Sequence, residues 1–443
     1  MKEATMIIQS DSIFDAVSEK PFRGAVVLAG NHIIDVVVDG DGREYAGSDT
    51  KVLDMGEGTV CPGFLDNHVF FTGYEWGCRG HETDGAEEQS PEMKEMFSDK
   101  AAMEEAYHRF SDFLASRGVT SIKEIGFDDY SGFTETLQKL DHEGRLKHRI
   151  NLVTQPVDAP MDLAQAKDWR DSLYSEFIRF MGFNLMVDGA NDEHDGDMLR
   201  EYLDLPGVTC NMEINYDALE EMVLNADREG FRCALHAEGD AAVRKTIDIF
   251  EKCREVNGPR DARHVITDLE MVDPEDVQRM HDLNIVASNY FQVMELYDTA
   301  EELYVESMCG ADRLDRIWNY RRIADAGVVY CTGTDMPLAV PDIPNTLYLV
   351  SGRYFPDGTP EGGFQPDQGL TRAEVIRAWT IHGQYANFRD QELGTLESGK
   401  LADIAVFDCD IFKKPMAEIR DAKIVLTLCD GRIVYERNGE SFS

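Results

Sequence analysis

Residues 61–71 read Cys61-Pro62-Gly63-Phe64-Leu65-Asp66-Asn67-His68-Val69-Phe70-Phe71, and the interpretation of the whole chain starts from them. The Pro-Gly pair predicts a turn, and the apolar residues after it predict a short strand with a polar end. Because side chains alternate between the faces of a strand, Asp66, His68 and Phe70 lie on one side. A histidine in that place is either a functional group or an ordinary hydrogen-bonded residue, and the rest of the chain has to decide between the two.

The composition describes a globular protein with a strongly acidic surface. The chain of 443 residues is long enough for one large domain and a smaller one, and 43% of its residues are hydrophobic. A net charge of −41 repels phosphate backbones, which argues against nucleic acid as a partner. The simplest interpretation of this charge is solubility, and a preference for a neutral or cationic small-molecule substrate over an anionic one is the weaker alternative. The sequence leaves homo-oligomer formation open.

Targeting signals and paired cysteines are not evident in the sequence. The first residues lack a basic region followed by an apolar run, and no apolar segment reaches the roughly 20 residues of a membrane helix. The nine cysteines are scattered without paired spacing, which is typical of reduced thiols. We therefore expect a cytoplasmic protein with no membrane partner.

The periodicity predicts an α/β protein of two parts. Residues 1–60 alternate apolar and polar positions between turns, and residues 390–443 contain further strand-like runs, so these two segments are predicted to form one composite β-sandwich domain. Residues 61–389 alternate strand-like and helical patterns, including a predicted helix over Thr371–Tyr385. Eight such strand runs predict a (β/α)₈ TIM barrel.

Polar residues follow the predicted barrel strands, at the end where such barrels carry their chemistry. These residues are His68, Asp188, His236, Asp268 and Asp335. Two long segments, 77–100 and 189–206, follow the first and fourth strands. They are expected either to line the pocket or to form mobile surface.

Motifs along almost the whole chain resemble the amidohydrolase superfamily, within it the amidohydrolase-3 branch that includes N-substituted formamide deformylase-like proteins. The stretch at 61–71 is similar to the pattern Pro-Gly-Phe-x-Asp-x-His-x-His, except that Phe70 replaces the second histidine. The other matching segments are Gly118-Val119-Thr120-Ser121, Leu185-Met186-Val187-Asp188-Gly189, Leu235-His236-Ala237-Glu238-Gly239-Asp240, Arg263-His264-Val265-Ile266-Thr267-Asp268, Gly333-Thr334-Asp335-Met336-Pro337 and Leu396-Glu397-Ser398-Gly399-Lys400-Leu401-Ala402-Asp403.

The resemblance implies a barrel with a β-sandwich, one or two divalent metals, and hydrolysis of amide-like bonds by a metal-bound hydroxide. Three metal ligands of the family pattern are replaced here, by Phe70, Asn184 and Asp268. Asparagine cannot form the carbamate that a bridging lysine forms in the branch, so a two-metal site is not expected. One divalent ion, zinc, iron or manganese, is the predicted cofactor.

The resemblance implies a role for each of the remaining polar residues. His68, His236 and Asp335 are the predicted metal ligands. Asp335 and His236 are the predicted catalytic residues, with Asp335 as the proton shuttle if it does not bind the metal tightly. Asp268, Phe70 and Asp188 are predicted to contact substrate, although Asp268 is also a candidate metal ligand and Asp188 a candidate turn cap.

Three functions remain open at this point. The first is a mononuclear metal-dependent hydrolase that acts on a non-peptide carbon–nitrogen bond of a small molecule. The second is a metal-free lyase, isomerase or decarboxylase that uses the same histidine and aspartates for acid–base chemistry. The third is a non-catalytic relative that binds a ligand. The fold alone does not choose among them, because one barrel hosts many chemistries.

Overall fold

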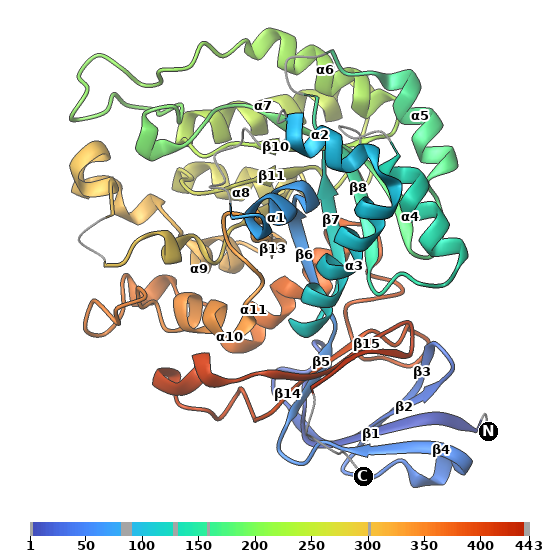
Figure 1. The fold of residues 1–443 in the computed structure, drawn as a ribbon. Helices are drawn as coiled ribbons and strands as arrows, with labels where there is room; N and C mark the ends of the chain where they lie inside the picture. Colours follow the sequence, from blue (N-terminus) through green and yellow to red (C-terminus); the bar gives the residue numbers. More distant parts are fainter. Residues whose placement is uncertain (1–2, 81–90, 127–131, 157–159, 300–302, 438–443) are drawn as a thin grey trace.

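A barrel of eight parallel strands lies beside a second eight-stranded sheet (Figure 1). The computed structural model describes residues 3–80, 91–126, 132–156, 160–299 and 303–437. The barrel strands neighbour one another in chain order, which confirms the predicted α/β barrel. They are β6 (Phe64–Val69), β7 (Val119–Ile125), β8 (Arg149–Thr154), β9 (Ile178–Met186), β10 (Arg232–His236), β11 (Val265–Thr267), β12 (Val286–Asn289) and β13 (Tyr330–Thr332).

The first and last barrel strands meet just beyond their carboxyl ends. The backbone N–H of Asp335 donates to the carbonyl of His68 at 3.0 Å, and the N–H of Phe70 donates to the carbonyl of Met336 at 3.0 Å. These two bonds hold the segments after β6 and β13 side by side. His68 and Asp335 are therefore neighbours although 267 positions separate them in the sequence.

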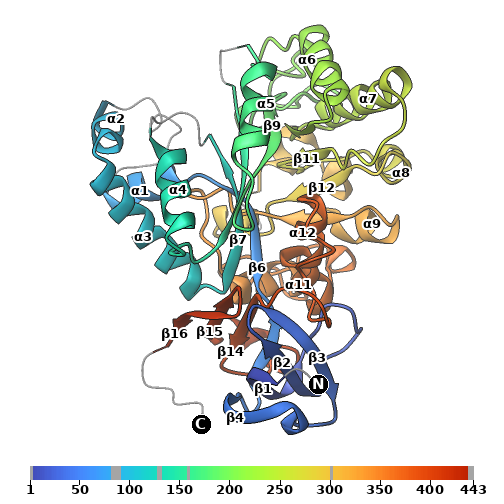
Figure 2. The same ribbon diagram turned by 90° about the vertical axis from the view of Figure 1, so that its right-hand side faces the viewer.

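Helices cover the outside of the barrel (Figure 2). The predicted helix over residues 371–385 is divided in two, because Thr380 adopts φ −125° and ψ −101°, outside the helical region. The helices are α1 (Phe71–Cys78), α2 (Pro91–Ser98), α3 (Lys100–Ser116), α4 (Phe133–His142), α5 (Leu163–Ser172), α6 (Tyr216–Arg228), α7 (Asp240–Asn257), α8 (Pro274–Asp282), α9 (Tyr320–Asp325), α10 (Ile343–Thr346), α11 (Arg372–Trp379) and α12 (Ile381–Ala386).

The second sheet combines strands from both ends of the chain, as the sequence predicted. Its order is β16-β15-β14-β5-β1-β2-β3, with β4 paired to β1, and a separate core of Ile, Leu and Val packs on it. The longest strand, β1, was not among the predicted ones. The strands are β1 (Ala4–Ile13), β2 (Phe22–Ala29), β3 (His32–Val38), β4 (Ala46–Asp54), β5 (Thr59–Pro62), β14 (Ile404–Phe407), β15 (Ile424–Cys429) and β16 (Arg432–Glu436).

The chain crosses from this sheet into the barrel at Gly63. Pro62 still pairs with β14, and Phe64 already begins the first barrel strand. A β-carbon on Gly63 would lie 2.3 Å from the hydroxyl oxygen of Thr120, so the close approach of the two sheets requires glycine here.

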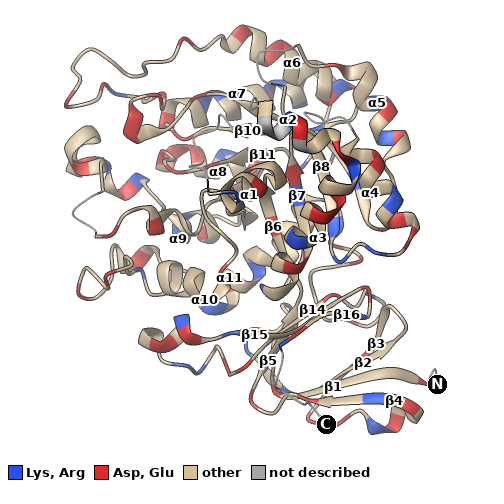
Figure 3. Ribbon diagram, viewed as in Figure 1, with Lys and Arg blue, Asp and Glu red and all other residues tan. Residues whose placement is uncertain are grey.

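Charge and hydropathy follow the expectations from composition. Asp and Glu side chains are spread over the helices and loops of both parts of the molecule (Figure 3). Within the described residues, no helix combines the length and the apolar character needed to span a bilayer.

Candidate functional site

A cavity of about 230 Å³ opens beyond the carboxyl ends of the barrel strands. One of its walls is acidic, while Trp318, Tyr290, Tyr297 and aliphatic residues contribute aromatic and apolar surface. Among the described residues that line it, none is a lysine or an arginine. The acids are Asp192, Glu238, Asp268, Glu270 and Asp335.

His68 is a buried, neutral imidazole whose unshared electron pair faces Asp335. Burial lowers the pKa of His68 to about 3, so the ring is uncharged near neutral pH. Its Nδ1 lies 3.0 Å from the Tyr290 hydroxyl, which also hydrogen-bonds to Asp268. If Tyr290 donates to Asp268, it accepts from Nδ1 of His68, which leaves Nε2 as the free acceptor. That nitrogen is 3.5 Å from an oxygen of Asp335.

His236 at the end of β10 lies in a strongly negative field. Its Nε2 is 3.6 Å from Glu238 and 3.9 Å from Asp268, and its Nδ1 is 3.8 Å from Asp188. Burial alone would lower the pKa of His236, but these carboxylates raise it to about 10. The arrangement around His236 therefore attracts positive charge.

The two aspartates after β11 and β13 have opposite protonation tendencies. Burial and the charge of Asp268 raise the pKa of Asp335 to about 8, which favours its protonated form. Burial would also raise the pKa of Asp268, but the two nearby histidines and the hydroxyls of Thr267 and Tyr290 lower it. The pair thus offers one carboxylic acid and one carboxylate in the same pocket, the usual division for acid–base work.

Asp188 and Phe70, predicted to contact substrate, do not line the cavity. Asp188 is fully buried, and its carboxylate accepts the backbone N–H groups of Asp197, Glu238 and Gly239 at 2.8, 3.0 and 2.9 Å. It holds the loop after β9 against the turn after β10, which agrees with the alternative interpretation as a turn cap. Phe70 packs its ring 5.6 Å from that of His68, beside the reacting groups.

Glu238 and Glu270 belong to the cavity, although they were not among the predicted site residues. Each follows a predicted residue by two positions, His236 and Asp268 respectively. Alternate side chains of an extended segment share a face, so this spacing identifies Glu238 after His236; it does not identify Glu270, because Asp268 adopts φ 59° and interrupts the alternation. The predicted role of the segment 189–206 as pocket lining holds for Asp192, whereas residues 81–90 of the other long segment lie outside the described residues.

The donor atoms at this cavity are suited in kind to a divalent metal. The spacings of 3.5–3.9 Å are too long for hydrogen bonds and close to the separation, about 3.4 Å, of two ligands on one tetrahedral ion. They join His68 with Asp335, and His236 with both Glu238 and Asp268; the two histidine–aspartate contacts are the pairs that contain the predicted ligands. The three predicted ligands His68, His236 and Asp335 do not have all their ligand atoms within 4.8 Å of one another. The two histidine–aspartate pairs could bind the same ion only if their ligand atoms came closer together than they are in this structure. Asn184 donates to Gln155 at 2.7 Å and offers no bridging ligand.

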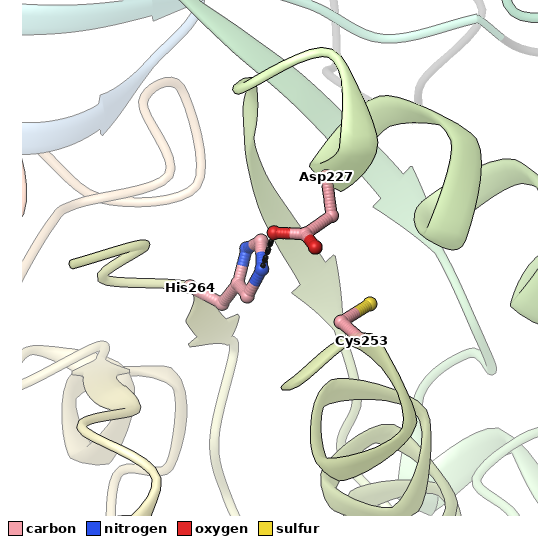
Figure 4. A group of neighbouring side chains, drawn as sticks. All are labelled: Asp227, Cys253 and His264. Carbon is pink, nitrogen blue, oxygen red and sulfur yellow. Dashed lines mark hydrogen bonds and ion pairs between the residues drawn. The ribbon is translucent and has the colours of Figure 1, made fainter. Parts of the chain in front are cut away.

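A different group, of Asp227, Cys253 and His264, has its ligand atoms within 4.8 Å of one another (Figure 4). Its hydrogen bonds argue against a metal. His264 Nδ1 accepts the backbone N–H of Cys233 at 3.1 Å, so Nε2 carries the proton and donates it to Asp227 at 3.1 Å. Arg260 donates to the same oxygen of Asp227 at 2.6 Å, and its charge repels a cation. The group is a buried ion-pair network.

Replacing Asp227 by asparagine is expected to lower the free energy of unfolding by about 3 kcal/mol, because His264 and Arg260 lose their buried partner. Burial alone would raise the pKa of Asp227, but hydrogen bonds from His264 and Asn257 and the charge of Arg260 lower it to about 2. The folded-state pKa is below the ordinary value, so the stabilisation is present above pH 4 or so and is lost as the pH falls towards 2. Urea unfolding of both proteins between pH 7 and 2 checks this. A difference that stays constant over this range contradicts it.

Comparisons with known proteins agree with this architecture. A sequence model described as "Amidohydrolase family" matches residues 83–435. The chain is 25% identical over 355 residues to Protein LONG AFTER FAR-RED 3 of Arabidopsis thaliana, covering 78% of this chain and 59% of that protein. It is 24% identical over 228 residues to N-substituted formamide deformylase of Arthrobacter pascens, covering 50% and 40%. An uncharacterized metal-dependent hydrolase from Pyrococcus furiosus shares the fold, with a TM-score of 0.72 and 16% identity over 92% of this chain and 100% of that one.

The parallel barrel, with histidines and acids at the carboxyl ends of its strands, is the architecture in which barrel proteins carry their functional sites. The matched segment is most of the chain, and the protein belongs to the amidohydrolase family, in its amidohydrolase-3 branch. The chain spans about three fifths and two fifths of the two curated relatives named above.

Proposed function

We propose that the protein is a metal-dependent hydrolase of an amide-like, non-peptide carbon–nitrogen bond in a small molecule. The observation that carries the proposal is the meeting of His68, His236, Asp268 and Asp335, from four different barrel strands, beside one cavity. Membership of the amidohydrolase family supports hydrolysis, and the name N-substituted formamide deformylase shows that one relative acts on a carbon–nitrogen bond.

The chain's own residues supply binding and proton transfer in this reaction. A divalent ion held by His68, His236 and Asp268 would activate water and polarise the scissile carbonyl, and this arrangement leaves Asp335 free to transfer protons. Asp335, in its carboxylic acid form, is placed to give a proton to the leaving nitrogen. Asp268 keeps its negative charge, and Tyr290 connects it to His68 and fixes the ring of that histidine.

Metal content is the most direct test of this proposal. After growth with zinc, iron and manganese salts, the purified protein is expected to contain close to one ion per chain. A chelator should remove the ion together with the activity, and the same ion should restore both. His68→Ala is expected to lower the metal content while the circular dichroism spectrum stays that of the wild type.

The same measurement separates the alternatives. Protein that takes up none of the three ions but still converts a substrate contradicts the metal-dependent reaction and supports metal-free acid–base chemistry. Release of amine or ammonia from a panel of N-formyl amines, N-acetyl amines and lactams tests the bond class. Turnover of esters alone would exclude a carbon–nitrogen bond as the target.

A further inference from the structure

The cavity beside the reacting groups has a second acidic wall that the proposed hydrolysis does not use. Glu238 and Glu270 form this wall, and Trp318, Tyr297 and Leu296 line the same cavity. The reacting centre needs a carbonyl activator and a proton donor, which the two histidine–aspartate pairs supply. Glu270 is in neither pair, so its place in the cavity calls for a different explanation.

Neutral donors hold Glu270 in a fixed orientation. Asn191 and Tyr304 donate to one of its oxygens at 2.9 and 2.7 Å, and the indole N–H of Trp318 lies 3.3 Å from the other. Asn191 also ties the two acids together, because its backbone N–H donates to Glu238 at 2.9 Å and its amide to the Glu238 carbonyl at 3.2 Å. Burial raises the pKa of Glu270, and these hydrogen bonds oppose that shift because they favour the carboxylate form.

Glu270 has no basic side-chain partner in the part of the chain that the structure describes, whereas Glu238 has one in His236. The charged group nearest to Glu238 there is His236 at 3.6 Å, and the side-chain partners of Glu270 are the three neutral donors. Glu270 is held in place without a counter-charge, and Glu238 adds a second acid beside it, so Glu270 favours a cation from the ligand. Aromatic faces next to them add cation–π attraction for the same group.

The opening of the cavity has the opposite character. Leu296 and Leu338 line the cavity and remain 48% and 46% exposed, which is unusual for leucine. The cavity therefore has an acidic, aromatic interior and an apolar rim. This division matches a molecule with a charged end and an apolar body.

We propose that this cavity selects amides that carry an ammonium group, and that Glu270, with Glu238 and Trp318, binds that group while the amide carbonyl faces the histidine–aspartate pairs. The inference rests on the proposed function and adds the substrate class to it. Glu270 is a specificity residue in this scheme, since it touches the substrate away from the reacting atoms.

The test compares two amides of equal length, N-(4-aminobutyl)acetamide with a terminal ammonium and N-pentylacetamide with a terminal methyl. Binding is measured by calorimetry in the Asp335→Asn variant, in which turnover is expected to be about 10³-fold slower, so that hydrolysis during the titration is small. The ammonium amide is expected to bind about 10-fold more tightly than the neutral one. Glu270→Gln should bring that ratio close to one and leave the affinity for N-pentylacetamide unchanged.

Glu193→Gln is the matched control, because Glu193 is an exposed acid on the same loop as Asn191 and is not among the residues that line the cavity. It should keep the full preference for the ammonium amide. Equal binding of the two amides, or a ratio that Glu270→Gln does not change, overturns the inference. Selective binding without turnover in the metal-loaded wild type would instead overturn the proposed hydrolysis and leave the ammonium site standing.

Discussion

Replacing Asp335 by asparagine is expected to lower kcat for an alkyl amide about 10³-fold, within the range that a lost general acid–base group costs. The side chain lies 3.5 Å from His68 Nε2, lines the cavity, and has its pKa raised to about 8 by burial and by Asp268. The asparagine amide has nearly the same shape, but it cannot transfer a proton to the leaving nitrogen. KM is expected to change little, since the substrate contacts remain.

The dependence on the leaving group separates this chemical role from a structural one. An alkyl amine needs protonation to leave, whereas 4-nitroaniline leaves with little help, so the variant should be impaired far less on a 4-nitroanilide than on an alkyl amide. Rates for both substrates are measured in wild type and variant, with thermal unfolding as the control for folding. An equal loss on both substrates would show that Asp335 is not the proton donor.

The sequence was sufficient to predict the barrel because the strand and helix patterns that indicate it are local. Most of the eight strands contain a short, largely apolar run, and a candidate polar residue lies at the end of, or just after, five of them. The nearness of His68 and Asp335 also follows, since the first and last strands of a closed barrel are neighbours. The two-sheet division depends on equally local turn and strand patterns, although β1 was overlooked at the start of the chain.

The functions of individual acids were harder to predict, because they depend on contacts between distant loops. Asp188 was expected at the substrate, but backbone N–H groups from residues 197, 238 and 239 occupy its carboxylate. The side chain of Glu270 is oriented by hydrogen bonds from Asn191, Tyr304 and Trp318, which lie on three other segments. No periodic pattern encodes such contacts, and the left-handed backbone at Asp268 interrupts the alternation that would otherwise place Glu270 on the same face.

Breaking the ion pair between Arg149 and Asp403 is expected to cause the largest loss of stability, about 3–5 kcal/mol for Asp403→Ala. Arg149 begins β8 and is fully buried. Its Nε and Nη2 donate to the two oxygens of Asp403 at 2.9 and 3.0 Å, so the pair joins the barrel to the chain just before β14 of the second sheet. The variant leaves a guanidinium in the interior with only Asp430, at 3.1 Å, as a charged partner.

Urea unfolding of Asp403→Ala measures this loss of stability. Two further variants show whether the loss comes from the buried, unpaired charge. Glu143→Gln removes one of two carboxylate partners of Arg145, the other being Glu104, in a surface pair that is about two fifths exposed on both sides, and should cost no more than about 1 kcal/mol. The double variant Arg149→Met with Asp403→Leu removes both charges and should recover much of the loss, because the desolvation cost disappears together with the attraction. If Asp403→Ala unfolds as the Glu143 variant does, the buried pair does not stabilise the junction. If the double variant is as unstable as Asp403→Ala, the cost lies in packing rather than in the unpaired charge.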